Sequence, residues 1–518
     1  MMKNRVLIFI LSFILIFSIF PLGEIGAEDN RDEFRVGMEV SYAPFNWTQT
    51  NGGNGAVPVQ GSQEYANGYD VQIAKMVADK LGKKLVVVKI EWDGLLPAVQ
   101  SNKIDAIIAG MSPTKEREEV LDFTQSYYES KLVLVTRNDS KYANAESLAD
   151  FSGARVVGQL NTFHDSVIDQ IPEVIHSEPM ADFSSMRVAI ESGKIDAYVA
   201  ERPEGMAAEL ANPAFKMVEL KEGFETNPED TSIAIGLNKG SSYLEPINEI
   251  LEEISNEDKQ EIMDQMIKIQ ETSDSQETVW SIFSSNWQMF FRGTLLTVLL
   301  SLVGTIAGLF IGFIVAVIRT APKAKNKILN FLLNILKILT NIYVQVIRGT
   351  PMMVQAVLFY YGLQLFFDIN TSPMASAFII VSINTAAYMA EVVRAGINAI
   401  DKGQVEAAKA LGMNHRQTMV YIILPQVFKN IIPNVGNEFI VNIKDTSVLN
   451  VISVNELFFT TKSIAGVNFR FFQTYFIASA IYLILTLSIT GLLRLLEKKL
   501  EGDSSYVKID HDVLSSGN

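Results

Sequence analysis

Long uncharged runs in the second half of the chain constrain its fold more than any other feature. The run Thr294–Ile318 contains 25 residues without a charge, enough to cross a hydrocarbon core about 30 Å thick at about 1.5 Å per helical residue. A further stretch, Ile423–Ile443, is interrupted by Lys429 and Glu438. Three more runs are long enough to span a membrane, and these are Gly349–Phe367, Ile369–Ala390 and Phe471–Leu493. We therefore predict that residues 286–500 form an all-α transmembrane domain of about five helices.

Basic residues between these runs predict the orientation of the domain, because short cytoplasmic loops are rich in Lys and Arg. They gather after the first run, around residues 394–416, and after the last run. These residues are Arg319, Lys323, Lys325, Lys327, Arg394, Lys402, Lys409, Arg416, Arg494, Lys498 and Lys499. An odd number of spans then places the first half of the chain outside and the C-terminus inside. Lys462 and Arg470 are basic residues on the predicted outer side.

Charge and cysteine content separate the two halves and exclude several kinds of site. Residues 276–518 carry 19 Lys+Arg and 13 Asp+Glu, a balance of +6, so residues 1–275 carry −21 of the total of −15. This describes an acidic soluble domain followed by a membrane domain with basic loops. No basic patch with interleaved aromatic residues predicts nucleic-acid binding. The chain has no cysteine, which excludes disulfides, thiolate metal sites and a lipid-modified cysteine, and we predict no metal site.

The N-terminus has the pattern of a secretory signal peptide. Lys3 and Arg5 precede an apolar run of 15 residues, Val6–Phe20, and the small residues Gly26 and Ala27 suit a cleavage site. We predict a signal peptide over residues 1–27, and the alternative is an uncleaved anchor helix. Either interpretation implies that the domain that follows is exported.

Residues 34–270 alternate short β-rich runs with helical patterns, which favours an α/β fold with helix-covered sheets. Leu85–Ile90 and Leu132–Thr136 are typical of the strands, and Val71–Leu81 is typical of the helices. The boundaries that we predict are a soluble domain at 28–272, a linker at 273–285 beginning with the polar stretch SDSQE, and a cytoplasmic tail at 501–518.

The segment from Ala106 to Arg117 has the features of an anion site. Ala106–Ala109 is predicted to be a buried strand, and Ser112 and Pro113 suit the N-cap and first position of a helix. The free N–H groups at a helix start attract an anion, and Arg117, one turn later, can donate two hydrogen bonds to a carboxylate. The same pattern also suits a capped surface helix with a solvated arginine, so the segment alone does not decide between the two.

Five motifs occur in order along the first half of the chain. They are RVGMEVSYAPFNW (35–47), GYDVQIAKMVADKLG (68–82), EWDGLLPAVQSNKIDAIIAGMSPTKER (91–117), GQLNTF (158–163) and KIDAYVAER (194–202). Together they make this half resemble the extracytoplasmic solute-binding proteins of polar amino-acid ABC importers. The resemblance implies a two-lobed α/β clamp of the periplasmic-binding-protein type. Lobe 1 would comprise about 34–129 and 222–270, and lobe 2 about 131–220. Residues 46–67, rich in Gly, Asn and Gln, are expected to be a surface loop.

The resemblance also implies which residues hold an amino acid. Arg117 would bind the α-carboxylate together with Thr162, and Glu201 would bind the α-ammonium group, although Asp is more usual at that position. Tyr42 and Trp92 match aromatic positions on either side of the ligand's side chain. Each of these residues also has a purely structural interpretation, as a loop, core or helix-start residue. The predicted ligand-binding residues are Glu39, Tyr42, Trp92, Gly110, Ser112, Arg117, Thr162 and Glu201.

Glu39 matches the position that faces the distal end of the ligand's side chain. A carboxylate there suits the head group of arginine, lysine or histidine, and aromatic faces suit a guanidinium group. We therefore expect a basic amino acid as the substrate. Glutamine is the alternative, because a carboxylate also accepts a hydrogen bond from an amide.

Residues 286–500 resemble the permease of the same class, a type I ABC importer. The matching stretches are RGTLLTVLLS (292–301), VIRGTPMMVQ (346–355), AYMAEVVRAGINAI (387–400), EAAKALGMNHRQTMVYIILPQ (406–426) and NEFIVNIKDTSVLNVIS (437–453). In the coupling loop of such permeases Glu406 and Ala407 would lie on a short helix that contacts an ATPase. Gly412 would end that helix, since Gly permits the left-handed C-terminal turn.

The chain contains no G-x-x-x-x-G-K-[ST] phosphate-binding loop, so we expect a separate cytoplasmic ABC ATPase dimer to hold ATP and Mg²⁺, and no cofactor in this chain. The permease class works in pairs, which implies a homodimer surrounded by membrane lipid. The expected protein is a non-enzymatic, multi-pass importer subunit in the plasma membrane of a Gram-positive type of bacterium, with its binding domain outside. A ligand-gated channel with an amino-acid clamp is a more distant alternative, but its clamp would be interrupted by membrane segments, whereas this one is contiguous. An enzyme built on the clamp would have no need of a permease.

Overall fold

The computed structural model describes residues 32–501 except 50, 63, 228–230, 271–277, 325 and 469, and describes no side chains at 270, 467 and 496–501. The predicted signal peptide at 1–27 lies outside the described residues. So do residues 502–518 of the predicted tail and the part of the predicted linker up to residue 277.

Lobe 1 is built on a five-stranded sheet in the order β6-β1-β7-β14-β8. The strands are β1 (Glu33–Met38), β6 (Lys84–Lys89), β7 (Ala106–Ile107), β8 (Leu121–Glu129) and β14 (Ser232–Asn238). Its helices are α2 (Tyr69–Lys80), α3 (Trp92–Gln100), α4 (Lys115–Glu118), α9 (Leu244–Glu252) and α10 (Asn256–Gln270). β1, β6 and β7 are parallel and β14 runs antiparallel to β7 and β8. Buried aliphatic side chains of the strands, such as Val36 and Ile107, form the core, as expected of a sheet covered by helices.

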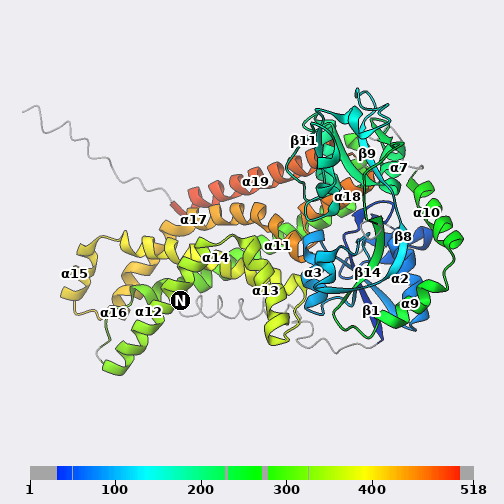
Figure 1. Cartoon of the computed structure of the whole chain (residues 1–518). Helices are drawn as coiled ribbons and strands as arrows, with labels where there is room; N and C mark the ends of the chain where they lie inside the picture. Colours follow the sequence, from blue (N-terminus) through cyan, green and yellow to red (C-terminus); the bar gives the residue numbers. More distant parts are fainter. Residues whose placement is uncertain are drawn as a thin grey trace, which may run out of the picture. The chain divides into compact units, whose positions relative to one another are not determined.

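Lobe 2 is built on a second sheet, in the order β11-β10-β12-β9-β13. Strands β9 and β11 of this lobe are labelled in Figure 1. The strands are β9 (Leu132–Arg137), β10 (Arg155–Val157), β11 (Ile175–His176), β12 (Ala197–Glu201) and β13 (Phe215–Val218). The helices are α5 (Phe163–Ser166), α6 (Phe183–Glu191) and α7 (Arg202–Ala211). The chain passes between the two sheets twice, from β8 to β9 and from β13 to β14, so two crossing segments connect the lobes.

The predicted surface loop at 46–67 instead carries most of a third, small antiparallel sheet, in the order β2-β3-β5-β4. Its strands are β2 (Ser41–Tyr42), β3 (Asn46–Gln49), β4 (Val57–Pro58) and β5 (Tyr65–Asn67), and the 3₁₀ turn η1 is Gly53–Gly55. The amide of Gln49 donates to the carbonyl oxygens of Asn51 and Gly53, and that of Asn67 donates to Asn54. The prediction of a plain loop was wrong because these polar side chains satisfy the turn backbone and leave the flanking residues free to pair.

The second half is helical, with α11 (Val279–Thr320), α12 (Lys327–Gly349), α13 (Met352–Phe367), α14 (Pro373–Asn398), α17 (Leu424–Asp445) and α19 (Phe471–Glu501) as its longer helices. Four helices among the described residues are long and apolar enough to cross a membrane, α11, α12, α14 and residues 471–495 of α19. α11 begins at Val279, inside the predicted linker, where the backbone N–H of Ser281 donates to the Thr278 hydroxyl, 3.2 Å away.

Two predicted features of the membrane half need correction. α12 was missed because its apolar residues are interspersed with Asn and Lys, although it is long and apolar enough to span. The predicted span Gly349–Phe367 is only α13, whose 16 residues cover about 24 Å, less than the hydrocarbon core. Pro351 separates α12 from α13, because proline disfavours helical backbone at the residue before it.

Small and polar residues join α11, α14 and α17. A Cβ at Gly308 would lie 2.6 Å from Thr385, and one at Gly312 would lie 2.7 Å from the carbonyl oxygen of Ala386, so glycine allows close approach of the helices. The buried amide of Asn442 donates to the hydroxyls of Thr305, at 2.9 Å, and Thr385, at 3.0 Å. The three helices therefore pack through a spaced glycine row and a shared hydrogen-bond group.

Candidate functional site

Tyr42 joins the two lobes. Its ring is 5% exposed and stacks on Phe45 of lobe 1 at a centroid distance of 5.1 Å and on Phe183 of lobe 2 at 4.7 Å. Its hydroxyl donates to the carboxylate of Glu201, which ends β12 in lobe 2. The lobes are therefore in direct contact, and both faces of the Tyr42 ring are covered by protein in this structure.

Glu201 is the buried anion of lobe 2, 3% exposed. Its other oxygen lies 3.0 Å from Nε2 of His164, although the two groups are not aligned for a hydrogen bond. Burial tends to raise the pKa of Glu201, but His164 and the Tyr42 hydroxyl together lower that pKa below its usual value. Glu201 is thus held ionised, as an anchor for an ammonium group must be. His164 directly follows the motif GQLNTF but was not among the predicted ligand-binding residues.

Arg117 extends from lobe 1 to lobe 2. Its Nη1 donates to the carbonyl oxygen of Ser112 at 2.9 Å, and its Nη2 donates to the carbonyl oxygen of Asn161 at 3.0 Å. The guanidinium lies over the Trp92 ring, 5.1 Å from its centroid. Burial lowers the pKa of Arg117 to about 10, so the group remains charged at neutral pH.

The helix that carries Arg117 is shorter than predicted. α4 begins at Lys115, after Thr114 as its N-cap, rather than at Pro113 with Ser112 as N-cap. Thr114 keeps extended backbone angles, and its N–H donates to the Ser112 carbonyl oxygen at 3.0 Å, which forms a tight turn ahead of the helix. A four-residue helix offers little partial charge, so Arg117 itself is the main cationic feature of this segment.

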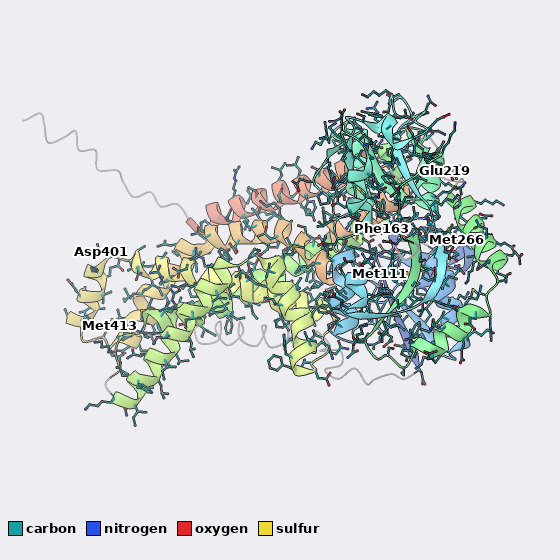
Figure 2. All side chains as sticks on the ribbon, in the orientation of Figure 1. Met111, Phe163, Glu219, Met266, Asp401 and Met413 are labelled. Atoms are coloured by element: carbon teal, nitrogen blue, oxygen red, sulfur yellow. The ribbon has the colours of Figure 1, made fainter. Side chains whose placement is uncertain are left out.

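Thr162 and Gly110 occupy turns beside these residues. Thr162 is the N-cap residue of α5, and its hydroxyl donates to the carbonyl oxygen of Gln159 at 2.7 Å. Gly110 has a φ of 65°, and a Cβ there would lie 2.9 Å from the Tyr42 ring, so only glycine fits. Met111 and Phe163, the chain neighbours of Ser112 and Thr162, are labelled in Figure 2.

Glu39 belongs to a separate acidic group. It is 7% exposed, and its Oε1 has no hydrogen-bond partner among the described residues. Burial raises the pKa of Glu39 to about 8, Lys462 acts in the opposite direction, and Glu91, Asp182 and Asp93 raise the pKa further. The sequence analysis identified Glu39 but missed Glu91 and Asp182, whose proximity depends on the packing of the two lobes.

The structure thus brings seven of the eight predicted residues together in two groups at the face between the lobes, and Glu39 belongs to the separate acidic group. One group consists of Tyr42, Glu201 and Gly110. The other consists of Trp92, Ser112 and Arg117. Thr162 is next to Asn161, whose carbonyl oxygen accepts a hydrogen bond from Arg117. A cation at one end and an anion at the other suit the charged main-chain groups of an amino acid. Within the described ranges, no group of three or more His, Asp or Glu could hold a metal ion.

The predicted coupling loop is a helix-turn-helix. α15 (Lys402–Ala410) is capped by Asp401, whose side chain accepts from the Gly403 N–H, and α16 (His415–Thr418) follows. Gly412 has a φ of 79°, the predicted left-handed turn. Asp401 and Met413 bracket α15 (Figure 2). Glu406 and Ala407 are exposed, and so is Leu411, at 82%, which the sequence analysis did not single out. The loop therefore offers an apolar and charged surface.

Comparison with known proteins decides the family. Residues 34–268 match the model of bacterial extracellular solute-binding proteins, family 3, and residues 308–502 match that of the binding-protein-dependent transport system inner membrane component. The glutamine transport system permease protein GlnP of Escherichia coli (strain K12) is 38% identical over 161 residues, 31% of this chain and 74% of the relative. The arginine transport system permease protein ArtQ of Bacillus subtilis (strain 168) is 36% identical over 165 residues, 32% of this chain and 75% of the relative.

The chain belongs to the amino-acid ABC importers. It carries a solute-binding domain and a permease domain in one polypeptide, as predicted. A crystal structure described as an amino acid ABC transporter with histidines is 36% identical and covers 43% of this chain and 99% of its own, with a TM-score of 0.39. The two family matches and the apolar helices make the importer a multi-pass membrane protein with an α/β clamp in front of a helical permease region.

Proposed function

We propose that this importer captures a cationic amino acid outside the cell and passes it through its own permease domain. The observation that carries the proposal is the buried carboxylate of Glu39, one oxygen of which lacks a hydrogen-bond partner in the described part of the chain. Glu91, Asp182 and Asp93 add negative charge around it. The ammonium of Lys462 offsets part of this negative charge. The Glu39 oxygen without a partner still lacks a donor, and a buried acceptor without a donor is costly, so this acidic group favours a further ammonium or guanidinium head group.

Glutamine is the second candidate substrate, because the relatives include permeases named for glutamine as well as for arginine. A glutamine amide N–H can donate to the ionised carboxylate of Glu39. Because the pKa of Glu39 is raised, the carboxyl can also be protonated, and its O–H can then donate to the amide oxygen of glutamine. The two substrates share their main-chain groups and differ only at this end, so Glu39 is where they can be told apart.

Arginine binding should strengthen as the pH rises from 6 to 8. The pKa of Glu39 lies at about 8, so this carboxyl is largely protonated at pH 6 and ionises as the pH rises. A guanidinium binds the ionised form, and affinity should therefore increase by roughly tenfold per pH unit below the pKa. Calorimetric titration of the purified full chain with L-arginine, in buffers of differing ionisation enthalpy, measures both the affinity and the proton released.

Glutamine serves as the matched ligand control, since it carries the same main-chain groups, and its affinity should change little over this range. Glu39→Gln should weaken arginine binding and remove its pH dependence. If glutamine binds more tightly than arginine at pH 8, the cationic assignment is wrong. If neither amino acid binds at any pH, the site assignment also fails.

The energy for transport, we propose further, comes from a separate cytoplasmic ABC ATPase dimer that contacts α15. This proposal is supported by the exposed residues Glu406, Ala407 and Leu411, which lie on a helix-turn-helix whose first helix is capped by Asp401. Apolar side chains on α12 and α19, such as Leu339 at 56% exposed and Leu487 at 63%, suit membrane lipid and a second copy of the chain. The proposed importer is a homodimer of Gram-positive type with extracellular binding domains.

Replacing Leu411 with aspartate should abolish association with the ATPase, because it removes an exposed apolar contact and adds a charge that an interface would bury. Glu406→Ala should weaken association to a lesser degree. Co-purification with the ATPase and amino-acid-stimulated ATP hydrolysis in vesicles report the effect, while amino-acid binding by the same variants should stay unchanged. Full transport by Leu411→Asp would rule out this contact.

A further inference from the structure

A short helix between α17 and α19 packs directly on the binding domain. This helix, α18 (Leu457–Asn468), is buried over most of its length, including Phe459 and Ile464. A Cβ at Gly466 would lie 3.0 Å from the carbonyl oxygen of Ser41 in β2, so α18 packs closely against the small sheet. Ser463 hydrogen-bonds Lys89, which also pairs with Glu64 at 2.9 Å.

Lys462 of α18 pairs with one carboxylate from each lobe. Its ammonium group contacts Glu91, the residue before α3 in lobe 1, and lies 2.9 Å from Asp182, the N-cap of α6 in lobe 2. The side chain of Lys462 is 11% exposed, and those of Glu91 and Asp182 are 15% and 13% exposed. The Ser185 N–H donates to Asp182 at 2.8 Å and holds it in place.

This geometry requires the two lobes to be close together. One ammonium can contact both carboxylates only when each lies about 3 Å from its nitrogen. Glu91 and Asp182 lie on different lobes, and a hinge motion about the two crossing segments would separate them. Opening the clamp would then leave at least one of these largely buried charges without its partner, which is costly.

Two other contacts of the permease segments with the binding domain each involve a single lobe. Lys103 of lobe 1 donates to Asn370 and lies over the Tyr360 ring at 3.7 Å. Arg470 donates to Asn212 of lobe 2 at 3.2 Å. Such contacts hold the binding domain but do not depend on how the lobes are placed relative to each other.

We propose that Lys462 is the residue by which the permease recognises the closed clamp, through its simultaneous contact with Glu91 and Asp182. An interaction that exists only in the closed state stabilises that state relative to the open one. By linkage, it also raises the affinity of the clamp for any ligand that it holds when closed. The effect on ligand affinity rests on the proposed capture of an amino acid, whereas the stabilisation of the closed state does not.

The first test measures lobe closure without a ligand. The chain has no native cysteine, so a cysteine pair at the exposed positions Lys75 of lobe 1 and Lys194 of lobe 2 can be spin-labelled selectively. Distance distributions are recorded for the full chain in lipid nanodiscs. Lys462→Met should shift the population from short to long distances, and Glu91→Gln should do the same, while Lys462→Arg should keep the short distance.

Ser463→Ala is the matched control, because it removes a contact from the same helix that reaches lobe 1 alone. It should leave the distance distribution unchanged. A distribution that is the same for Lys462→Met as for the unsubstituted chain overturns the proposal, and so does an equal shift with Ser463→Ala.

The second test uses binding of L-arginine or L-glutamine, whichever the unsubstituted full chain binds. Lys462→Met should raise the apparent Kd by about tenfold, a typical coupling between sites, and Ser463→Ala should not. Tighter binding by Lys462→Met would instead mean that Lys462 competes with the ligand for the carboxylates, and would overturn the proposal. If the unsubstituted chain binds neither amino acid, the proposed function fails, and the distance measurement still decides the role of Lys462.

Discussion

Replacing Arg117 with alanine should reduce the amino-acid affinity of the importer by at least about 100-fold, because two hydrogen bonds from a charged donor contribute about 1.5–3 kcal/mol each. Arg117 is a cation at the face between the lobes, over Trp92 and beside Ser112. Its carbonyl contacts to Ser112 and Asn161 orient the guanidinium plane. Removing it takes away the predicted partner of a ligand carboxylate and also a link between the lobes.

The measurement is equilibrium binding of a radiolabelled amino acid to the purified full chain. Arg117→Lys should recover part of the affinity, since a lysine keeps the charge but not the two-pronged geometry. Arg137→Ala is the matched control, because Arg137 forms an exposed pair with Asp139 in lobe 2. Unchanged affinity in Arg117→Ala would falsify the assignment of the carboxylate site.

Replacing Glu204 with alanine should destabilise lobe 2 by about 3–5 kcal/mol, the usual cost of leaving a buried charge without its partner. Arg187 and Glu204 are both 0% exposed. Nε of Arg187 donates to Glu204 at 3.1 Å, and the hydroxyl of Tyr198 donates to the same carboxylate at 3.0 Å. The group connects α6, α7 and β12 beneath the Glu201 end of the site.

Thermal unfolding of the full chain, followed by circular dichroism, reports this change. Glu146→Ala is the control, because Glu146 pairs with Lys221 at the surface, with side chains 66% and 73% exposed, and such pairs contribute about 0–1 kcal/mol. Equal unfolding temperatures for the two variants would contradict the prediction. Weakened ligand binding should accompany the loss of stability in Glu204→Ala, since Glu201 ends the strand that this group supports.

The contacts of Lys462 and Arg470 account for two basic residues on the outer side of the predicted topology. Positive residues favour the cytoplasmic side of a membrane protein, yet these two lie beside the binding domain. Lys462 pairs with Glu91 and Asp182, and Arg470 donates to Asn212. Two carboxylates of the acidic first half therefore offset the charge of Lys462, whereas the partner of Arg470 is the neutral amide of Asn212.

Local features of the sequence were sufficient to predict the structure of several parts of this protein. The uncharged run around Thr294–Ile318 predicted a membrane helix, because hydropathy is a property of neighbouring residues. The left-handed turn at Gly412 followed from the residue type at a helix end. The α/β alternation and the order of the motifs indicated the fold and the family, which the family comparisons confirm. The roles of Arg117, Glu201 and the other predicted ligand-binding residues stay predictions.

Only the tertiary structure decided where charges meet across distant segments. Lys462 and Glu91 are 371 residues apart, so nothing in the sequence near either residue indicates their contact. The small sheet likewise depends on pairing between Asn46–Gln49 and Tyr65–Asn67, two segments that are separated in the sequence. Local preference is set by neighbours a few residues away, whereas ion pairs and burial are set by the fold as a whole.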